Sequence, residues 1–381
     1  MINIKDKAEC CGCSACMAIC SKKAISMQAD TPLGFLYPHV DISLCINCGR
    51  CEEICQFKKN YKRYENYDSP IVYALRTSNK EELKKSQSGA AFLLFSDLIL
   101  LQGGVIYGAI FDKGFQVIHS RARSKEEREK MRMSKYVQSD MRNIYISIKN
   151  DLKLGLKVLF TGTPCQVAGI RSFIGEKLST NLYTIDLVCH GVPSPKVWQD
   201  YLNFLRKKYK QDIFYIITRD KKYGWSSHNE TYILANGKEK KRSTFRELFY
   251  RHYIVRESCS NCKFTNIQRV SDITIGDFWG WEKYHTEFMD NKGLSLVYIN
   301  SNKGQLLFDS ITPNAEIVKS SVQESIQPQL LHPITLPTDR DIFLNSYQKF
   351  GFKYIAYKYS DIGLYYKFHS FIFNLLAKLK K

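Results

Sequence analysis

Cysteine is the residue type whose spacing in this chain predicts chemistry most directly. Two runs, over residues 10–20 and 45–55, share the spacing C-x2-C-x2-C-x3-C. Bacterial ferredoxins have this spacing, and the fourth cysteine of each run binds the cluster of the other run. We therefore expect two [4Fe–4S] clusters. The ligands of the first are Cys10, Cys13, Cys16 and Cys55, and those of the second are Cys45, Cys48, Cys51 and Cys20.

Two alternative interpretations fit these runs less well. Zinc sites favour separate C-x2-C pairs over triple runs. Disulfides need an oxidising compartment, and the first residues lack the apolar stretch of an export signal. Proline usually follows the fourth cysteine of such a run, whereas Ser21 and Gln56 stand here. Since that proline is not a ligand, the departure weakens the match only slightly. Cys11 is left without a predicted role.

Four more cysteines lie downstream of the two runs. Cys165 opens a predicted helix, where backbone amides stabilise a thiolate. Cys189 ends the next predicted strand, and in a parallel sheet the two strand ends are neighbours. Cys259 and Cys262 form a C-x2-C pair that offers two ligands at once. The set suits a third [4Fe–4S] cluster or Zn²⁺, and ordinary buried cysteines are the remaining alternative. A rival hypothesis pairs Cys165 as nucleophile with His190 as base, but the sequence does not establish hydrogen-bond reach between them.

Composition and charge restrict the function classes. The net charge is +19 over 381 residues, and no uninterrupted run approaches the ~18 apolar residues of a membrane-spanning helix. We expect a cytoplasmic protein with a basic surface, on which a ferredoxin or another redox partner protein could dock. No DNA- or RNA-binding motif is present, which disfavours a nucleic-acid-binding iron–sulfur protein.

Hydrophobic patterning divides the rest of the chain. Residues 1–57 form the predicted ferredoxin module, and the polar residues 58–70 a linker. Over residues 71–335, strands alternate with helices, which is typical of an α/β domain. Strands are predicted at 71–76, 105–111, 115–122, 157–161, 182–188, 213–218, 230–235, 272–276 and 294–299, and helices at 90–101, 143–154, 164–173 and 195–208.

The tail, residues 336–381, is aromatic and basic. It could lie on an anionic membrane as an interfacial helix, at the inner face. We favour a helix packed on the domain with its lysines outward, because the polar residues are not clearly segregated to one face.

Electron transfer through clusters moves one electron at a time, so a two-electron reaction usually needs a converter such as a flavin. The chain has no G-x-G-x-x-G after a strand and no G-x-x-x-x-G-K-[ST]. Candidate phosphate contacts are the helix-opening loops 86–90 and 161–164, and residues 134–139 add a cation and an aromatic ring. Helix capping explains Ser88 and Thr163 equally well.

Six motifs appear in order: S-x-S-G, S-K-Y-V-Q-S, G-T-P-C-Q-V-A-G-I-R, D-L-V-C-H-G-V-P-S-P, C-x2-C-K-F and S-D-I-T-I-G-D-F-W-G. With these motifs, residues 1–285 resemble the beta-subunit family of coenzyme F420 hydrogenases and dehydrogenases, fused to an N-terminal two-cluster ferredoxin. Some members of the family do not use the deazaflavin, and others are encoded among bacterial surface-polysaccharide genes. The chain is most similar to the latter.

The resemblance implies an α+β ferredoxin-like two-cluster module followed by an α/β flavin-binding domain. It also implies bound FAD and favours a third cluster at Cys165, Cys189, Cys259 and Cys262. The family often has glycine where Ala90 stands, which puts close approach of a phosphate there in doubt. The implied flavin-pocket residues are Ser88, Gly89, Lys135, Tyr136 and Thr163, and the implied groups near the redox centre are His190 and Asp277.

Together these observations predict an iron–sulfur flavoprotein oxidoreductase. Electrons would pass between a ferredoxin-like donor, the clusters and FAD, with a small organic molecule as substrate and a possible role in surface-polysaccharide biosynthesis. The main alternative is an electron-transfer subunit without a substrate of its own.

Overall fold

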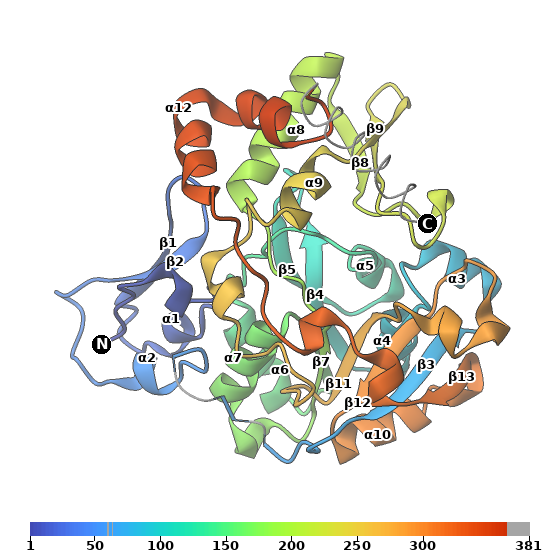
Figure 1. Ribbon diagram of the computed structural model, residues 1–381. Coiled ribbons are helices and arrows are strands. Elements are labelled where there is room, and N and C mark those ends of the chain that lie inside the picture. Colours follow the sequence, from blue (N-terminus) through green and yellow to red (C-terminus); the bar gives the residue numbers. More distant parts are fainter. Residues whose placement is uncertain (59–60, 63, 364–381) are drawn as a thin grey trace.

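The computed structural model describes residues 1–58, 61–62 and 64–363. In this part of the chain, a mixed eight-stranded sheet forms the body, and the N-terminal module lies against one side of it (Figure 1). Across the sheet the strands are β13 (Ala315–Ser320), β3 (Ile71–Thr77), β12 (Ser295–Ile299), β11 (Ile273–Asp277), β7 (Leu182–Leu187), β6 (Val158–Gly162), β4 (Val105–Phe111) and β5 (Val117–Ala122). Strands β11, β7, β6 and β4 are parallel, and the other pairings are antiparallel.

Smaller sheets and helices complete the structure. Strands β8 (Ile213–Ile217), β9 (Glu230–Leu234) and β10 (Glu239–Arg242) form a second sheet, and β1 (Ile25–Ala29) and β2 (Leu36–Val40) form a hairpin. The helices are α1 (Ala15–Ile19), α2 (Arg50–Glu53), α3 (Lys80–Lys85), α4 (Ala91–Leu101), α5 (Lys125–Glu129), α6 (Ile144–Lys153), α7 (Pro164–Ile174), α8 (Pro195–Tyr209), α9 (Thr244–Tyr250), α10 (Asn302–Asp309), α11 (Val322–Ser325) and α12 (Arg340–Tyr359).

Both faces of the large sheet are buried, which explains why its parallel strands are continuous apolar runs. Successive side chains of a strand point to opposite faces. Val158 and Phe160 of β6 pack with α6 and α7, whereas Leu159 packs with α4 and α10 on the other face. The predicted strands and helices of residues 71–299 are confirmed. Hydrophobic patterning did not predict β10, β13, α3, α5, α9, α10 or α11.

The N-terminal module is tied to the body at several points. Ser194, the N-cap of α8, donates a hydrogen bond to the backbone oxygen of Leu33 at 2.5 Å. Helix α1 contacts α7, and Phe35 packs in the same core as α8 and α9. The predicted linker is not free: the Asn66 amide donates to the backbone oxygens of Arg269 and Ser271. Residues 59, 60 and 63 of that segment lie outside the described part.

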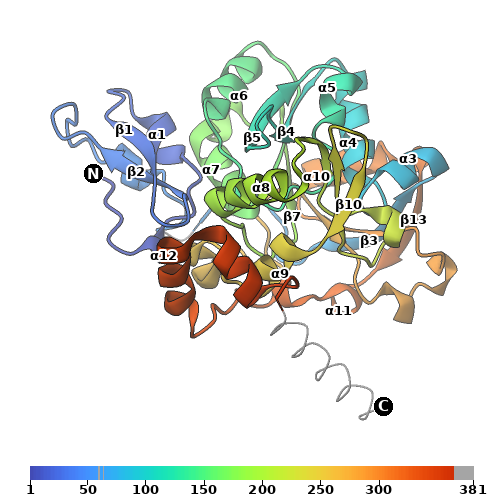
Figure 2. The same cartoon turned by 90° about the horizontal axis from the view of Figure 1, so that it is seen from above.

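Helix α12 packs on α8 and α9 and buries Phe343, Tyr347 and Ile355 (Figure 2, in red). This arrangement agrees with the packed-helix interpretation of the tail up to residue 363. Residues 364–381, to which the membrane-contact hypothesis also refers, lie outside the described residues. Within residues 1–363, as far as the structure describes them, no helix combines the length and the apolar character needed to cross a bilayer.

Candidate metal centres and cofactor cavity

The first cysteine run and Cys55 lie together. The electrostatic neighbours of Cys16 are Cys13, Cys10 and Cys55, as expected for a ligand exchanged between the runs. Backbone amides also point at the sulfurs: Ile2 donates to Cys51 Sγ at 3.1 Å and Ala24 donates to Cys20 Sγ at 3.3 Å. Such bonds are among the factors that set cluster potentials.

The four downstream cysteines line one cavity, although three separate parts of the chain carry them. Cys165 is in the first turn of α7 directly after β6, and Cys189 follows β7. Because β6 and β7 are parallel neighbours, the predicted proximity of these two residues is observed. Cys259 and Cys262 approach from the 3₁₀ turn Glu257–Asn261 and its end. Among the described residues, no group of three or more His, Cys, Asp or Glu is placed to hold a single metal ion, which is what a zinc site at these cysteines would require.

Buried polar contacts position this set. Arg269 donates to the backbone oxygens of Phe264 and Leu187 and forms a 3.0 Å ion pair with Asp186. It thereby joins the loop after Cys262 to the end of β7. Burial raises the pKa of Cys189 to about 12 and that of Cys262 to about 11, so both thiols are protonated near neutral pH.

Cys11 lies between the two groups of cysteines. Its side chain is buried, and its thiol is within hydrogen-bonding reach of the thiols of Cys13 and Cys165. Cys11 also lines the cavity of the downstream set. The structure thus places the first-run ligands and the downstream cysteines side by side, with the cysteine that had no predicted role between them.

The structure does not pair Cys165 as nucleophile with His190 as base. His252 Nδ1 lies 2.8 Å from the Thr335 backbone oxygen, which only accepts, so His252 Nε2 is the acceptor for His190 Nε2–H at 2.8 Å. His190 Nδ1 then accepts from the Gln329 amide at 2.8 Å. Burial and the neighbouring histidines lower the pKa of His190 to about 4. With both nitrogens engaged in the neutral ring, His190 has no hydrogen bond to Cys165 and cannot act as its base here.

A second, larger cavity of about 580 Å³ opens at the carboxyl ends of β6, β7 and β11. Small-molecule and cofactor sites have this size and this position in α/β folds. Six of the seven residues predicted for the flavin pocket and redox centre line it: Ser88, Lys135, Tyr136, Thr163, His190 and Asp277. Thr163, Cys189, His190, Gly191, Val192 and Gln329 line both cavities, so the two share a wall.

Gly89 is the predicted pocket residue that does not line the cavity. Its amide donates to Ser295 Oγ, and a Cβ atom there would lie 2.0 Å from the Leu75 backbone oxygen. Contact with β3 and β12, and not approach of a cofactor, therefore requires this glycine. The neighbouring Ser88 hydroxyl is also used by the protein, because it donates to the Leu294 backbone oxygen.

Helix α4 points its first turn into the cavity. Ala90, Ala91 and Phe92 line it, and no side chain caps the helix. Free first-turn amides and the helix dipole together favour an anion. Helix α7 differs, because Thr163 and Gln166 form a capping box at its start. The capping role anticipated for Thr163 is therefore present, although the residue also faces the cavity.

Ala90 adopts a left-handed backbone conformation with φ 71°. This conformation is unfavourable for alanine and free for glycine. We expect Ala90→Gly to raise the free energy of unfolding by about 0.5–1 kcal/mol, after subtraction of the extra entropy of an unfolded glycine. Denaturant titration measures this change. A lower unfolding free energy would show that the methyl group packs in a way that outweighs the strain.

Lys135 brings a cation to the cavity wall. Its ammonium donates to the backbone oxygens of Arg132 and Met133, and burial lowers its pKa to about 7. Asp277 is different, because its carboxylate pairs with Arg219 and accepts from Trp225 Nε1 at 3.2 Å. Asp277 therefore holds the cavity wall in place, and its carboxylate is not free for proton transfer.

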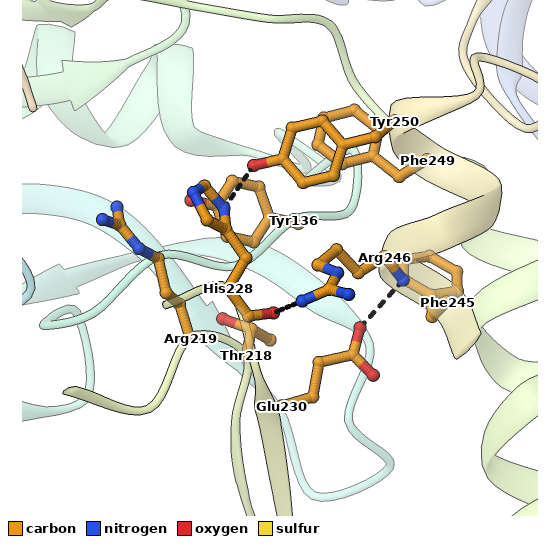
Figure 3. A pocket seen from close by; sticks show the side chains of 9 residues that line it. All are labelled: Tyr136, Thr218, Arg219, His228, Glu230, Phe245, Arg246, Phe249 and Tyr250. Carbon is orange, nitrogen blue, oxygen red and sulfur yellow. Dashed lines mark hydrogen bonds between the residues drawn. The ribbon is translucent and has the colours of Figure 1, made fainter. Parts of the chain in front are cut away.

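A side pocket contains residues that the sequence did not single out (Figure 3). Tyr136, His228, Phe249 and Tyr250 line both this pocket and the large cavity. The Tyr250 hydroxyl and His228 Nδ1 form a hydrogen bond of 2.7 Å, and burial lowers the pKa of His228 to about 4. Burial raises the pKa of Glu230 to about 7. No local spacing identifies these residues, since β9 and α9 bring them together.

Two family models match the chain. Residues 9–59 match a 4Fe-4S dicluster domain. Residues 155–325 match the family described as the C terminus of the coenzyme F420 hydrogenase/dehydrogenase beta subunit. The resemblance noted in the motifs is thereby confirmed, and so is the iron–sulfur character of the N-terminal module.

A curated relative and a solved structure are also similar. The chain is 25% identical over 340 residues to a coenzyme F420-dependent sulfite reductase of Methanocaldococcus jannaschii, with 81% of this chain and 47% of the relative covered. It therefore spans about half the length of that relative. A chain of the F420-reducing [NiFe] hydrogenase complex from Methanosarcina barkeri aligns with a TM-score of 0.48 and 18% identity, covering 74% of this chain and 88% of that chain.

Proposed function

We propose that this protein is an iron–sulfur flavoprotein oxidoreductase that transfers electrons between a redox partner protein and an organic substrate. It would hold two [4Fe–4S] clusters in the N-terminal module, a third at Cys165, Cys189, Cys259 and Cys262, and FAD in the large cavity. The observation that carries the proposal is the wall shared by the cysteine-lined cavity and the large cavity. Groups bound in these two cavities would be neighbours.

The residues fit these cofactors. Four thiols around one cavity are the donor set of a [4Fe–4S] cluster. The uncapped start of α4 and the Lys135 ammonium offer contacts to a phosphate, and Tyr136 and Trp279 offer aromatic surface. A flavin supplies the exchange between one-electron and two-electron transfer. Glu230, with a pKa about 7, can hold a proton beside the cavity at neutral pH.

Quantification of iron, sulfide and flavin in one anaerobically purified sample tests this proposal. We expect bound FAD and about twelve irons per chain. About eight irons without flavin would leave a two-cluster module on a domain without redox cofactors, and the oxidoreductase proposal would fail. Zinc in place of the last four irons would return the downstream cysteines to a structural role.

A second candidate function is an electron-transfer subunit without its own substrate. The relative named above has about twice the length of this chain, so a further part of the relative lies beyond the aligned region. Turnover of a small-molecule oxidant by the reduced protein separates the two candidates. A role in surface-polysaccharide biosynthesis remains a prediction of the sequence resemblance and would require a sugar-derived substrate.

We propose that electrons enter at the surface around the second cysteine run. Ile42 is 74% exposed, Leu44 50% and Ile46 61%, and they lie in the same segment as Cys45 and the exposed Cys48. An exposed apolar patch of this kind is typical of a protein-binding site. We place the docking surface of a ferredoxin-type carrier here, and not on the basic surface that the net charge suggested.

Ile46→Glu tests this docking surface. Since Ile46 is exposed, the change should leave stability within about 0.5 kcal/mol. A charge in an apolar contact should weaken association with a reduced ferredoxin about fivefold to tenfold. Stopped-flow reduction at varied ferredoxin concentration measures it, with Ile146→Glu as an exposed control on α6. Equal rates in the two variants would rule out docking at the second run.

A further inference from the structure

Arg256 is a fully buried cation among the cysteines. Its guanidinium donates three hydrogen bonds, all to neutral acceptors: the Cys10 backbone oxygen at 2.7 Å, Gln138 Oε1 at 2.8 Å and the Leu36 backbone oxygen at 3.0 Å. Among the residues that the structure describes, no carboxylate forms an ion pair with it. The adjacent carboxylate, Glu257, pairs with Arg340 at 3.5 Å.

Residues of both the N-terminal module and the body of the protein position the Arg256 guanidinium. It lies over the Tyr37 ring at 4.1 Å, and a Cβ atom on Gly12 would come within 2.8 Å of Nη1. Its own backbone begins the turn that carries Cys259, whose amide donates to the Arg256 oxygen. Arg256 therefore lies at the junction between the N-terminal module and the downstream cysteines.

A buried charge is stable only when an opposite charge lies near it. The groups beside Arg256 that become negative when they bind a cluster are cysteines, because its guanidinium donates to the Cys10 backbone oxygen and Arg256 lines the same cavity as Cys165. A [4Fe–4S] cluster with four thiolate ligands is an anion, and reduction adds one more negative charge. A nearby cation stabilises the reduced cluster more than the oxidised one.

We propose that Arg256 is the countercharge of the cluster bound by Cys10, Cys13, Cys16 and Cys55, and that it raises the reduction potential of this cluster. The electron comes from a one-electron carrier of the ferredoxin class, and the cluster gains one electron without a proton. A higher potential favours transfer of the electron to this cluster from the cluster of Cys45, Cys48, Cys51 and Cys20. This inference rests on the cluster assignment in the proposed function.

Arg256→Gln and Arg256→Lys test the proposal in the full chain, with Arg340→Gln as the matched control. Arg340 is also buried, but its hydrogen bonds go to the backbone oxygens of Tyr253 and Val255 and not to the N-terminal module. Anaerobic potentiometric titration followed by electron paramagnetic resonance measures each cluster. We expect Arg256→Gln to lower the potential of one cluster of the N-terminal module and leave that of the other unchanged. Arg256→Lys and Arg340→Gln should retain the wild-type potential near neutral pH.

Unchanged potentials in Arg256→Gln with full iron content would overturn the inference, as would the same shift in Arg340→Gln. If Arg256→Gln does not fold, the lysine variant carries the test, because a buried lysine loses its charge as pH rises. Its potential should then fall with pH while that of the wild type does not, and parallel curves would overturn the inference. Wild-type protein without any [4Fe–4S] signal would instead refute the proposed function itself.

Discussion

Cys189→Ala should remove about four of about twelve irons and leave the two clusters of residues 10–55 in place. Cys189 lies on the wall between the two cavities, and its electrostatic neighbours Cys165 and Cys262 belong to the same set. A cubane at this site that loses the Cys189 thiolate keeps only three of its predicted ligands. Reduction of the bound flavin by an external one-electron donor should then fall by more than ~100-fold, since loss of groups that merely support a ligand already costs 10–100-fold in metal affinity or activity.

Cys11→Ala is the matched control for this variant. Cys11 lines the same cavity and is also buried, but it is outside the predicted ligand sets. It should keep all irons, whereas Cys189→Ala should not. Iron and sulfide analysis with flavin-reduction kinetics on both variants gives the comparison. Normal flavin reduction in Cys189→Ala would exclude an electron path through the third cluster, and iron loss in Cys11→Ala would show that Cys11 is a ligand.

Much of the body was predictable because its strands are short apolar runs with clear ends. The parallel order also gave the proximity of Cys165 and Cys189, since neighbouring strands end at one edge. Strand β13 was missed because its partner β3 lies about 240 residues earlier, and a half-exposed A-E-I-V-K-S pattern does not reveal such a pairing.

The site was predictable only where one segment carried the signal. Spacing identified the cysteines, but it could not show that the turn of Cys259 reaches Cys189, because the path of the chain between them decides this. No sequence pattern singled out Arg256 or His228, because their contacts are with residues in other segments of the chain. The pattern at Gly89 was misleading. A glycine beside the start of a helix suggests close approach of a phosphate, whereas close contact with β3 explains why glycine stands here.

Lys135→Met should weaken flavin binding about 10- to 100-fold, because a hydrogen bond to a charged group contributes about 1.5–3 kcal/mol. The variant keeps most of the apolar stem of the side chain and removes the cation from the cavity wall. Flavin titration of the deflavinated protein measures the change. Lys130→Met is the control, since Lys130 is an exposed residue outside the cavity lining.

The pH dependence of flavin binding tests the role of Lys135 independently. In the cofactor-free protein the pKa of Lys135 is lowered to about 7 by burial, so the ammonium loses its proton as pH rises through that value. A bound phosphate favours the charged form, so wild-type affinity should begin to fall as pH rises through about 7, by at most tenfold per pH unit. Lys135→Met should lack this slope. Lys221, with a pKa lowered to about 8, donates to the Ser86 and Ser88 backbone oxygens and accounts for any slope that remains above pH 8. Equal slopes in wild type and variant would place the flavin phosphate away from Lys135 and leave the start of α4 as its contact.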